Sequence, residues 1–276
     1  MKEVKKYEFA ENVVDSRIFA EDELTFAVLG AIVKGKGTFA ATDNDKFVIF
    51  YSAEPFPVWL WTADDITEAE KEEIWEFCRE ENILPGVAGK YNITCYNMKY
   101  DMADFFVGKA KEEGLSIKIT MNMLVYECFE PKKPVRPADG GKQNMDEADL
   151  EEVARFIWQF KQDIGTDIEE LSACREKARD LIGRENFFLW KNGEGENVAM
   201  CNYNIEGDLA RVGLVFCKHE ERRKGYAENL VYEVTALVKE KGFRPILYTN
   251  GDYAASNACY KKVGYEEKGS LCSVGV

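Results

Sequence analysis

The residues best suited to chemistry form one short basic segment, in which three neighbouring cations stand beside small residues. An apolar run of strand character, Val212–Cys217, leads through charged residues into Arg222, Arg223, Lys224, Gly225, Tyr226 and Ala227. A helix is expected from about Gly225, because apolar residues recur from there at helical spacing. The N–H groups of a first helical turn have no partner within the helix, so they can bind an anion placed before them. We call residues 222–227 the cradle and predict that it binds phosphate; the alternative is an exposed basic turn.

Two common phosphate motifs are excluded here. The Gly-x4-Gly-Lys-Ser/Thr pattern of the Walker loop is absent, and the glycine spacing of the dinucleotide-binding fingerprint is replaced by cations. The cradle is therefore a different way of combining a strand end, a basic loop and a helix start.

A second segment downstream also carries polar residues at a strand end. Pro245–Thr249 has strand character, and Asn250, Gly251 and Asp252 have turn character. Ser256–Val263 then has the character of a short helix, which Gly264 ends. This helix contains Asn257 and Tyr260, which could supply an amide and a phenol to a ligand.

The two segments together resemble the motifs of the GNAT superfamily of N-acetyltransferases. The cradle resembles the superfamily's coenzyme A diphosphate motif, Arg/Gln-x-x-Gly-x-Gly/Ala, which follows a Val-rich strand. The second segment resembles its Asn…Tyr-x-x-x-Gly-Phe/Tyr signature, here ending in Gly264 and Tyr265. Asn257 stands only three residues before Tyr260, closer than in many members. That spacing is similar to a two-lobed bacterial GNAT group with a Leu-Tyr-Thr strand and a Ser-Asn-x-x-Tyr helix.

The resemblance implies a role for each site residue. The pantetheine arm of acetyl-CoA is expected along Val215, Phe216 and Cys217, with a backbone N–H near Phe216 as the oxyanion donor. The cradle is expected to bind the diphosphate, and further coenzyme contacts are expected at Asn250 and Asn257. Tyr260 is the expected general acid, because a phenol with a pKa of about 10 is protonated at neutral pH. The alternatives are a core aromatic for Tyr260 and a helix cap for Asn257.

No residue is identified as the general base. The strand Arg211–Cys217 carries no carboxylate, and the nearby acids are expected to be solvated, so water could accept the proton: Glu206, Asp208, Glu220 and Glu221. His219 is interpreted as an exposed loop histidine rather than a catalytic one. Cys217 is interpreted as packing, since direct attack by an amine needs no thiol nucleophile.

The elements needed to position these residues can be placed along the second half of the chain. Helices are expected at Asp146–Phe160 and Ile168–Ile182, and a first short strand around Val135. Further strands are expected at 187–190, 198–205, 211–217, 246–249 and 266–274. This order resembles a complete GNAT domain.

The first half shows a similar order without a basic loop. A helix is expected at 21–33, strands at 38–42, 46–53 and 57–62, and helices from Thr67 and at 101–113. A long strand at 116–129 follows. Gly86 and Gly89 are expected where a phosphate loop would be, yet no cations accompany them. We interpret this half as a duplicated GNAT-like lobe that lost coenzyme binding; the alternative is an unrelated α/β domain.

The expected fold is therefore α/β (α+β with a mixed sheet), in two tandem GNAT-like lobes of the acyl-CoA N-acyltransferase type. Residues 1–130 form the degenerate lobe and residues 131–276 the intact domain. The proline-rich segment 130–137 is the best boundary.

Composition limits the partners. The formal net charge of −14 disfavours a nucleic-acid partner and suits a cationic amine. The eight cysteines lack Cys-x-x-Cys spacing, so neither a metal site nor a disulfide framework is expected. The charged start lacks a signal-peptide core and no apolar run reaches eighteen residues, so we expect a cytoplasmic protein that does not enter a membrane.

The predicted function is transfer of an acetyl group from acetyl-CoA to a primary amine of a small molecule or amino acid. The alternative is a sensor or regulatory module that binds acetyl-CoA without turnover. The sequence leaves open whether the chain forms a homodimer.

Overall fold

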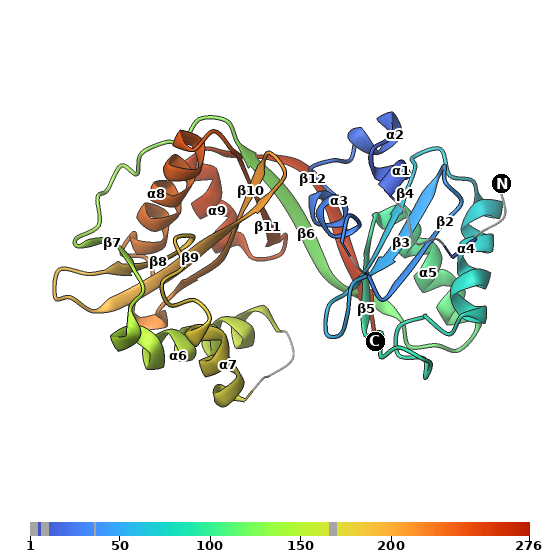
Figure 1. The fold of residues 1–276 in the computed structure, drawn as a ribbon, viewed down its shortest axis with the longest axis horizontal. Helices are drawn as coiled ribbons and strands as arrows, with labels where there is room; N and C mark the ends of the chain where they lie inside the picture. The colour runs from blue at the N-terminus through green and yellow to red at the C-terminus, as the bar shows by residue number, and fades with distance from the viewer. Residues whose placement is uncertain (1–4, 7–10, 36, 166–169) are drawn as a thin grey trace. The chain divides into compact units, whose positions relative to one another are not determined.

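The computed structural model describes residues 5–6, 11–35, 37–165 and 170–276 (Figure 1). The chain divides into two compact units. Unit 1 comprises residues up to 125 together with 268–276, and unit 2 comprises residues 126–267. The expected boundary after residue 130 lies five positions beyond the first division, and the return of residues 268–276 to unit 1 was not expected from the sequence.

Unit 1 is a mixed sheet with helices on both faces. Its strands lie in the order β1-β2-β3-β4-β5, followed by β12 and β6. The strands span Lys5–Lys6 (β1), Phe39–Thr42 (β2), Phe47–Tyr51 (β3), Val58–Thr62 (β4), Cys95–Met98 (β5), Lys118–Cys128 (β6) and Tyr265–Gly275 (β12). The helices span Glu11–Val14 (α1), Arg17–Ala20 (α2), Ala27–Ile32 (α3), Glu68–Glu80 (α4) and Tyr100–Glu112 (α5).

Local sequence signals set the start of α4. The Thr67 side chain accepts a hydrogen bond from the N–H of Glu70 at 3.3 Å, and Glu70 Oε2 accepts one from the N–H of Thr67 at 2.8 Å. This reciprocal capping satisfies two N–H groups that the first turn leaves free. The helix then buries Ile74 and Trp75 in the core of unit 1.

Unit 2 has the strand order β11-β10-β9-β8-β7, and its remaining strand residues belong to β6 and β12. Its strands span Gly141–Asn144 (β7), Phe187–Lys191 (β8), Asn197–Glu206 (β9), Leu209–Cys217 (β10) and Arg244–Asn250 (β11). Its α-helices span Leu150–Ile164 (α6), Leu171–Arg179 (α7), Tyr226–Glu240 (α8) and Ala254–Val263 (α9). In Figure 1, α6 and α7 cover one face of β8, β9 and β10, and α8 and α9 lie on the other.

Both units repeat one arrangement of elements. In unit 1, three antiparallel strands lead into α4 and then into β5, which runs parallel to β4. In unit 2, β8, β9 and β10 are antiparallel, and α8 then leads into β11, which runs parallel to β10. The expected mixed α/β fold is confirmed.

Most expected elements are present, and three expectations are wrong. The helix expected at 21–33 begins only at Ala27. No strand forms around Val135, which is 96% exposed between two prolines, and β7 supplies the first strand of unit 2 instead. Gly86 and Gly89 lie between α4 and β5, so they do not follow the strand that precedes a cradle-like joint.

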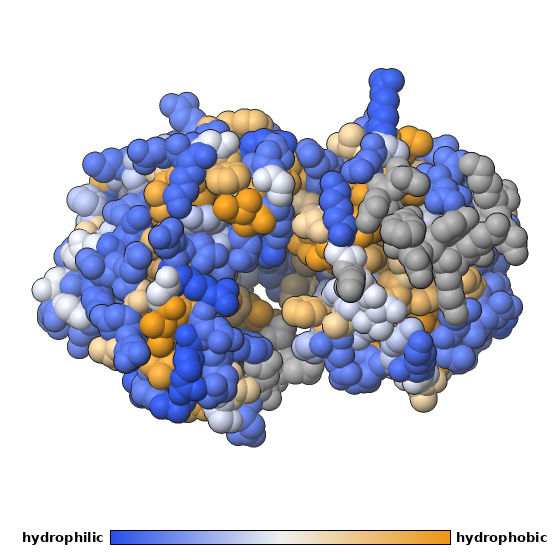
Figure 2. All heavy atoms as spheres, in the orientation of Figure 1, coloured by the Kyte–Doolittle hydropathy of each residue, from blue (hydrophilic) through white to orange (hydrophobic). Residues whose placement is uncertain are grey.

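Two further differences concern coverage. The strand β5 was not expected from the sequence. The helix expected at 168–182 is observed as α7, and positions 168–169 lie outside the described residues. Most of the surface in view is hydrophilic (Figure 2), as the 31% of charged residues implies. Within the described ranges, no helix has the length and apolar character needed to span a bilayer.

Candidate active site

The strands β10 and β11 separate at the centre of unit 2. They are paired in parallel only where Leu209–Arg211 face Arg244–Ile246. Beyond that point, Val212–Cys217 and Leu247–Asn250 have no pairing with each other among the described residues. Two neighbouring strands therefore present unpaired backbone groups toward one another, which is where an extended ligand can add hydrogen bonds.

A bulge lies in β10 beside this opening. The register with β9 shifts between Gly213 and Phe216, and Leu214 has a positive φ of 47°. Leu214 and Val215 consequently have no cross-strand partner on β9. Bulges bend a strand and redirect its backbone groups, and they occur frequently next to active sites.

The register directs the N–H of Phe216 itself toward β9, so the donor expected near Phe216 has to come from a neighbouring residue. The N–H of Lys218 donates to the carbonyl of Val198 at 2.9 Å. In an antiparallel ladder such bonds recur every two residues, so the N–H of Phe216 also points toward β9. The ring of Phe216 packs in the core against Phe156, with centroids 5.2 Å apart. Leu214 and Val215, which have no cross-strand partner on β9, are therefore the positions from which an N–H could be directed at a ligand.

The cradle has the geometry of an anion site. Arg223 and Gly225 have positive φ angles of 65° and 96°, and α8 begins at Tyr226. The first backbone N–H of α8 to find a partner is that of Asn229, which donates to the carbonyl of Gly225. Six consecutive N–H groups, those of residues 223–228, donate no hydrogen bond within the described chain. Such a row at a helix start is suited to phosphate oxygens.

Two of the three cradle cations are already paired with carboxylates. Arg222 Nη2 lies 2.5 Å from Asp163 Oδ2, and Arg222 Nε donates to the carbonyl of Cys217 at 3.2 Å. Lys224 Nζ lies 2.9 Å from Glu221 Oε2. Arg223 makes no ion pair in the part of the chain that the structure describes. The backbone thus contributes more to this anion site than the residue types suggested.

His219 belongs to the support of the cradle. Its Nε2 lies 3.0 Å from Asp163 Oδ1, the same carboxylate that holds Arg222, and its side chain is 52% exposed. Asp163 belongs to α6, so this carboxylate connects the basic loop that follows β10 to α6. This geometry agrees with the interpretation of His219 as a loop residue.

Tyr226 and Asn229 hold the start of α8. The hydroxyl of Tyr226 donates to Asp139 Oδ1 at 2.7 Å, and this bond raises the pKa of Tyr226 to about 12. Asn229 Nδ2 donates to the carbonyls of Arg136 and Gly225 at 3.1 and 3.0 Å. Sequence reasoning missed Asn229, although its position one turn after Gly225 was a usable signal. Only the backbone of Tyr226 remains available to a ligand.

Asn257 presents a buried oxygen without a partner. Its Nδ2 donates to the carbonyls of Asn250 and Gly251 at 3.0 and 3.1 Å, which fixes the orientation of the amide. Its Oδ1 is buried and accepts no hydrogen bond from any described residue. An unsatisfied buried oxygen is costly unless a ligand supplies a donor. The side chain of Asn250, by contrast, accepts from the N–H of Asp252 at 2.8 Å and stabilises the turn.

Tyr260 is buried on α9, with 7% of its surface exposed. Its hydroxyl makes no hydrogen bond to the described residues. Burial raises the pKa of Tyr260, so the phenol keeps its proton over the whole physiological range. Burial also raises the pKa of Cys217 to about 11, which keeps that thiol protonated and a poor nucleophile.

Comparisons with known proteins agree with this geometry. Residues 193–274 match the model of the FR47-like protein family. The segment includes the bulge, the cradle, Asn257 and Tyr260. A GNAT-family acetyltransferase from Colwellia psychrerythraea is 13% identical with a TM-score of 0.59, covering 99% of this chain and 98% of that one. The chain therefore shares the fold of GNAT-family acetyltransferases.

Other solved structures show the same GNAT fold. A GCN5-related N-acetyltransferase from Kribbella flavida is 17% identical with a TM-score of 0.59, covering 94% of this chain and 96% of its own. One from Sphaerobacter thermophilus is 11% identical with a TM-score of 0.59, covering 99% and 94%. No curated protein matches the sequence. The similarity spans both units, so the GNAT likeness is not confined to unit 2.

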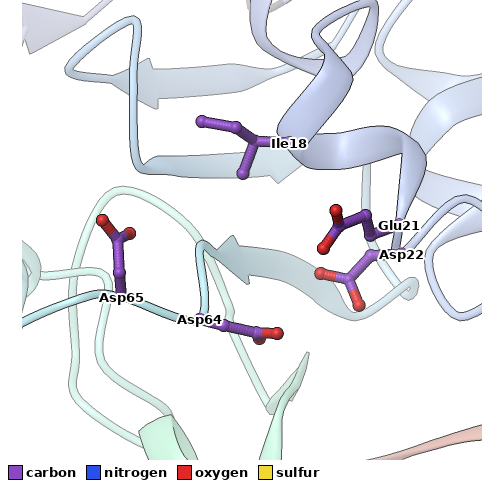
Figure 3. A pocket seen from close by; sticks show the side chains of 5 residues that line it. All are labelled: Ile18, Glu21, Asp22, Asp64 and Asp65. Atoms are coloured by element: carbon purple, nitrogen blue, oxygen red, sulfur yellow. The ribbon is translucent and has the colours of Figure 1, made fainter.

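The GNAT-like unit 1 has an acidic joint where unit 2 has the cradle. The joint between β4 and α4 contains Asp64 and Asp65, which line a pocket of about 240 Å³ together with Ile18, Glu21 and Asp22 (Figure 3). Lys99 Nζ lies 2.5 Å from Asp64 and also contacts Asp22, and Lys46 Nζ lies 3.3 Å from Asp65. A surplus of carboxylates repels phosphate, so this joint does not reproduce the cradle.

In the described parts of both units, no group of three or more His, Cys, Asp or Glu side chains is arranged so that it could hold a metal ion.

Proposed function

We propose that the chain transfers the acetyl group of acetyl-CoA to a primary amine of a small molecule or amino acid. The observation that carries this proposal is the row of six free N–H groups in residues 223–228, next to two strands that separate and a bulge. A diphosphate satisfies the N–H row, and an extended arm fits between the separated strands.

The site residues fit the coenzyme. The cradle would hold the diphosphate through backbone N–H groups, with Arg223 as the uncommitted cation. The pantetheine arm would lie along Val215 and Cys217, and its amide N–H would satisfy the buried Oδ1 of Asn257. Acetyl-CoA would supply an activated acetyl group as a thioester.

The chemistry assigned to the protein is charge stabilisation and one proton transfer. A neutral amine attacks the thioester carbon, so a carbon–nitrogen bond forms while the carbon–sulfur bond breaks. The N–H groups at Leu214 and Val215 stabilise the negative charge that develops on the carbonyl oxygen. Tyr260 donates its phenolic proton to the departing sulfur, the amine nitrogen releases one proton to water, and water returns a proton to Tyr260.

The state of Tyr260 favours an enzyme over a sensor. The phenol of Tyr260 is protonated at neutral pH and makes no hydrogen bond to the described chain, so its proton is available to a sulfur bound beside it. A module that only binds the coenzyme needs no proton donor at this position.

The test measures release of free coenzyme A thiol with acetyl-CoA and a panel of amines, amino acids, polyamines and aminoglycosides, alongside calorimetric titration with coenzyme A. Thiol release that depends on an amine supports the proposal. Tight coenzyme binding without release for any amine would instead make the chain a binding module, and absence of binding would exclude both functions.

A further inference from the structure

Two oxygen atoms on β9 are buried without a hydrogen-bond partner among the described residues: Oδ1 of Asn202 and Oε2 of Glu206. Asn202 is 8% exposed as a residue, and the side chain of Glu206 is 10% exposed. Buried polar atoms in native proteins nearly always have partners, so two such atoms on one strand require an explanation.

Both side chains lie on the same face of the strand. They are four residues apart on β9, and alternate residues of a strand share a face. Met200, two residues before Asn202, packs in the core formed with α6 and α7. Asn202 and Glu206 therefore continue the face that α6 and α7 cover at its other end.

Asn202 adjoins the bulge of β10. It pairs with Gly213, the last residue before the register shift. A Cβ built at Gly213 would lie 3.2 Å from Asn202 Oδ1 and, apart from adjacent residues, would meet no other described heavy atom within 4 Å. The absence of a side chain at Gly213 thus lets the unsatisfied oxygen of Asn202 lie close to the backbone of β10 at the bulge.

Glu206 is held in position by one of its oxygens and leaves the other free. Arg211 Nε and Nη2 both donate to Glu206 Oε1, at 2.8 and 2.7 Å. Four residues of strand separate Glu206 from Asn202, which corresponds to about 13 Å at roughly 3.3 Å per residue. One face thus offers two hydrogen-bond acceptors at a fixed spacing, and the outer one belongs to a carboxylate.

We propose that this face of β9 is the acceptor subsite, and that it selects a long amine with a second cationic group. Asn202 Oδ1 accepts a hydrogen bond from the attacking amine beside the bulge, and Glu206 Oε2 binds the distal ammonium group. The proposal rests on the proposed acetyl transfer, because the amine beside the bulge is the group that would attack the thioester. A net charge of −14 adds long-range attraction for such a substrate.

Kinetics on the full-length protein test the subsite. The probes are diaminobutane, diaminooctane and diaminodecane, each compared with the alkyl monoamine of equal length. The diamine-to-monoamine ratio of kcat/KM is expected to rise with chain length. Glu206→Gln should lower that ratio for the long diamines about 10-fold, since a hydrogen bond to a charged group is lost. Asn202→Leu should raise KM for both classes about 10-fold or more, and Gly213→Ala should act in the same direction.

Matched controls are available. Asn144→Ala removes an exposed amide on β7, and Glu240→Gln neutralises an exposed carboxylate at the end of α8. Both should leave the kinetic constants unchanged. A diamine preference that is absent in the parent, or that survives Glu206→Gln, would overturn the proposal.

A second measurement needs no turnover. Asn202→Leu removes an unsatisfied buried oxygen at similar volume, so the ligand-free variant should unfold at a temperature about 2–4 °C higher than the parent. In calorimetry with coenzyme A present, the parent should bind diaminodecane and the variant should not. If the parent lacks turnover but binds diaminodecane through Glu206, the proposed function fails and the subsite stands. If the parent acetylates monoamines but shows no diamine binding, only the subsite fails. A lower unfolding temperature with unchanged kinetics would make Asn202 structural.

Discussion

Replacing Tyr260 by phenylalanine tests the assigned proton donor most directly. The substitution removes one oxygen atom and keeps the ring, which is 6.2 Å from the ring of Tyr265 between centroids. Because the hydroxyl makes no hydrogen bond in the described chain, its removal breaks no internal contact. Folding and most coenzyme affinity should therefore be retained, and the change should fall on the chemical step.

The expected magnitude follows from the role of a general acid. Loss of such a group typically costs a factor of about 10² to 10⁴ in rate, which corresponds to about 2.7–5.4 kcal/mol of activation free energy. The free energy of unfolding should change little, because the hydroxyl makes no hydrogen bond to the described chain and the ring is kept. Turnover should therefore fall while stability is retained.

Alkaline pH offers an independent signature of the same residue. An unfolded tyrosine loses its proton near pH 10, whereas burial raises the pKa of Tyr260 in the folded protein. Above pH 10 the folded state then binds a proton that the unfolded state has released, so stability falls as pH rises, by up to about 1.4 kcal/mol per pH unit per tyrosine. Burial also raises the pKa of Tyr96 and Tyr265, so the variant should lose only part of this slope.

The assay combines thiol release with an accepted amine, calorimetric titration with coenzyme A, and urea unfolding between pH 8 and pH 11, all on one preparation. Equal turnover in variant and parent would refute Tyr260 as the acid and assign the proton to solvent. Loss of coenzyme binding together with loss of turnover would instead indicate that Tyr260 shapes the coenzyme site and does not donate the proton.

Three other outcomes are expected. Gly225→Glu should abolish coenzyme A binding because a carboxylate enters the anion site, whereas Gly225→Asn, which tolerates the positive φ without charge, should retain most of it; equal affinity for the Glu variant in calorimetry would exclude the cradle. Titration of the parent should give one coenzyme equivalent per chain because the joint of unit 1 is acidic, and a value near two would contradict this. Thr67→Ala should cost about 1 kcal/mol of stability in urea unfolding, and no loss would leave the capping box of α4 without energetic weight.

Local patterns located the candidate site residues that lie close together in the sequence. The cradle, Asn257 and Tyr260 lie within one strand–helix joint and one short helix, so their residue types and spacing carried the inference. The pairing of Arg222 with Asp163 could not be predicted in this way, because 59 residues separate them. Residue types alone therefore overestimated the free charge in the cradle.

Backbone register was the main feature that the sequence could not supply. The proposed oxyanion donor depends on where β10 shifts against β9, and the run Val212–Cys217 offers only Gly213, an isolated glycine inside a strand pattern, as a sign of the bulge at Leu214. The strand β5 was missed for a related reason. Its four residues mix apolar and polar types, and it pairs with β4 on one side and with β12 on the other.

The pairing of β5 with β12 has a consequence for how the protein is made. The carbonyl of Met98 accepts a hydrogen bond from the thiol of Cys272, 174 positions later in the chain. A ribosome must therefore synthesise all of unit 2 before β5 can acquire its second neighbour. During that interval β5 is an open sheet edge, which invites pairing with other nascent chains and chaperone capture. Release of properly folded protein should thus depend on events late in translation, and ribosome-bound fragments ending before β12 should be more sensitive to proteases in unit 1 than the finished chain.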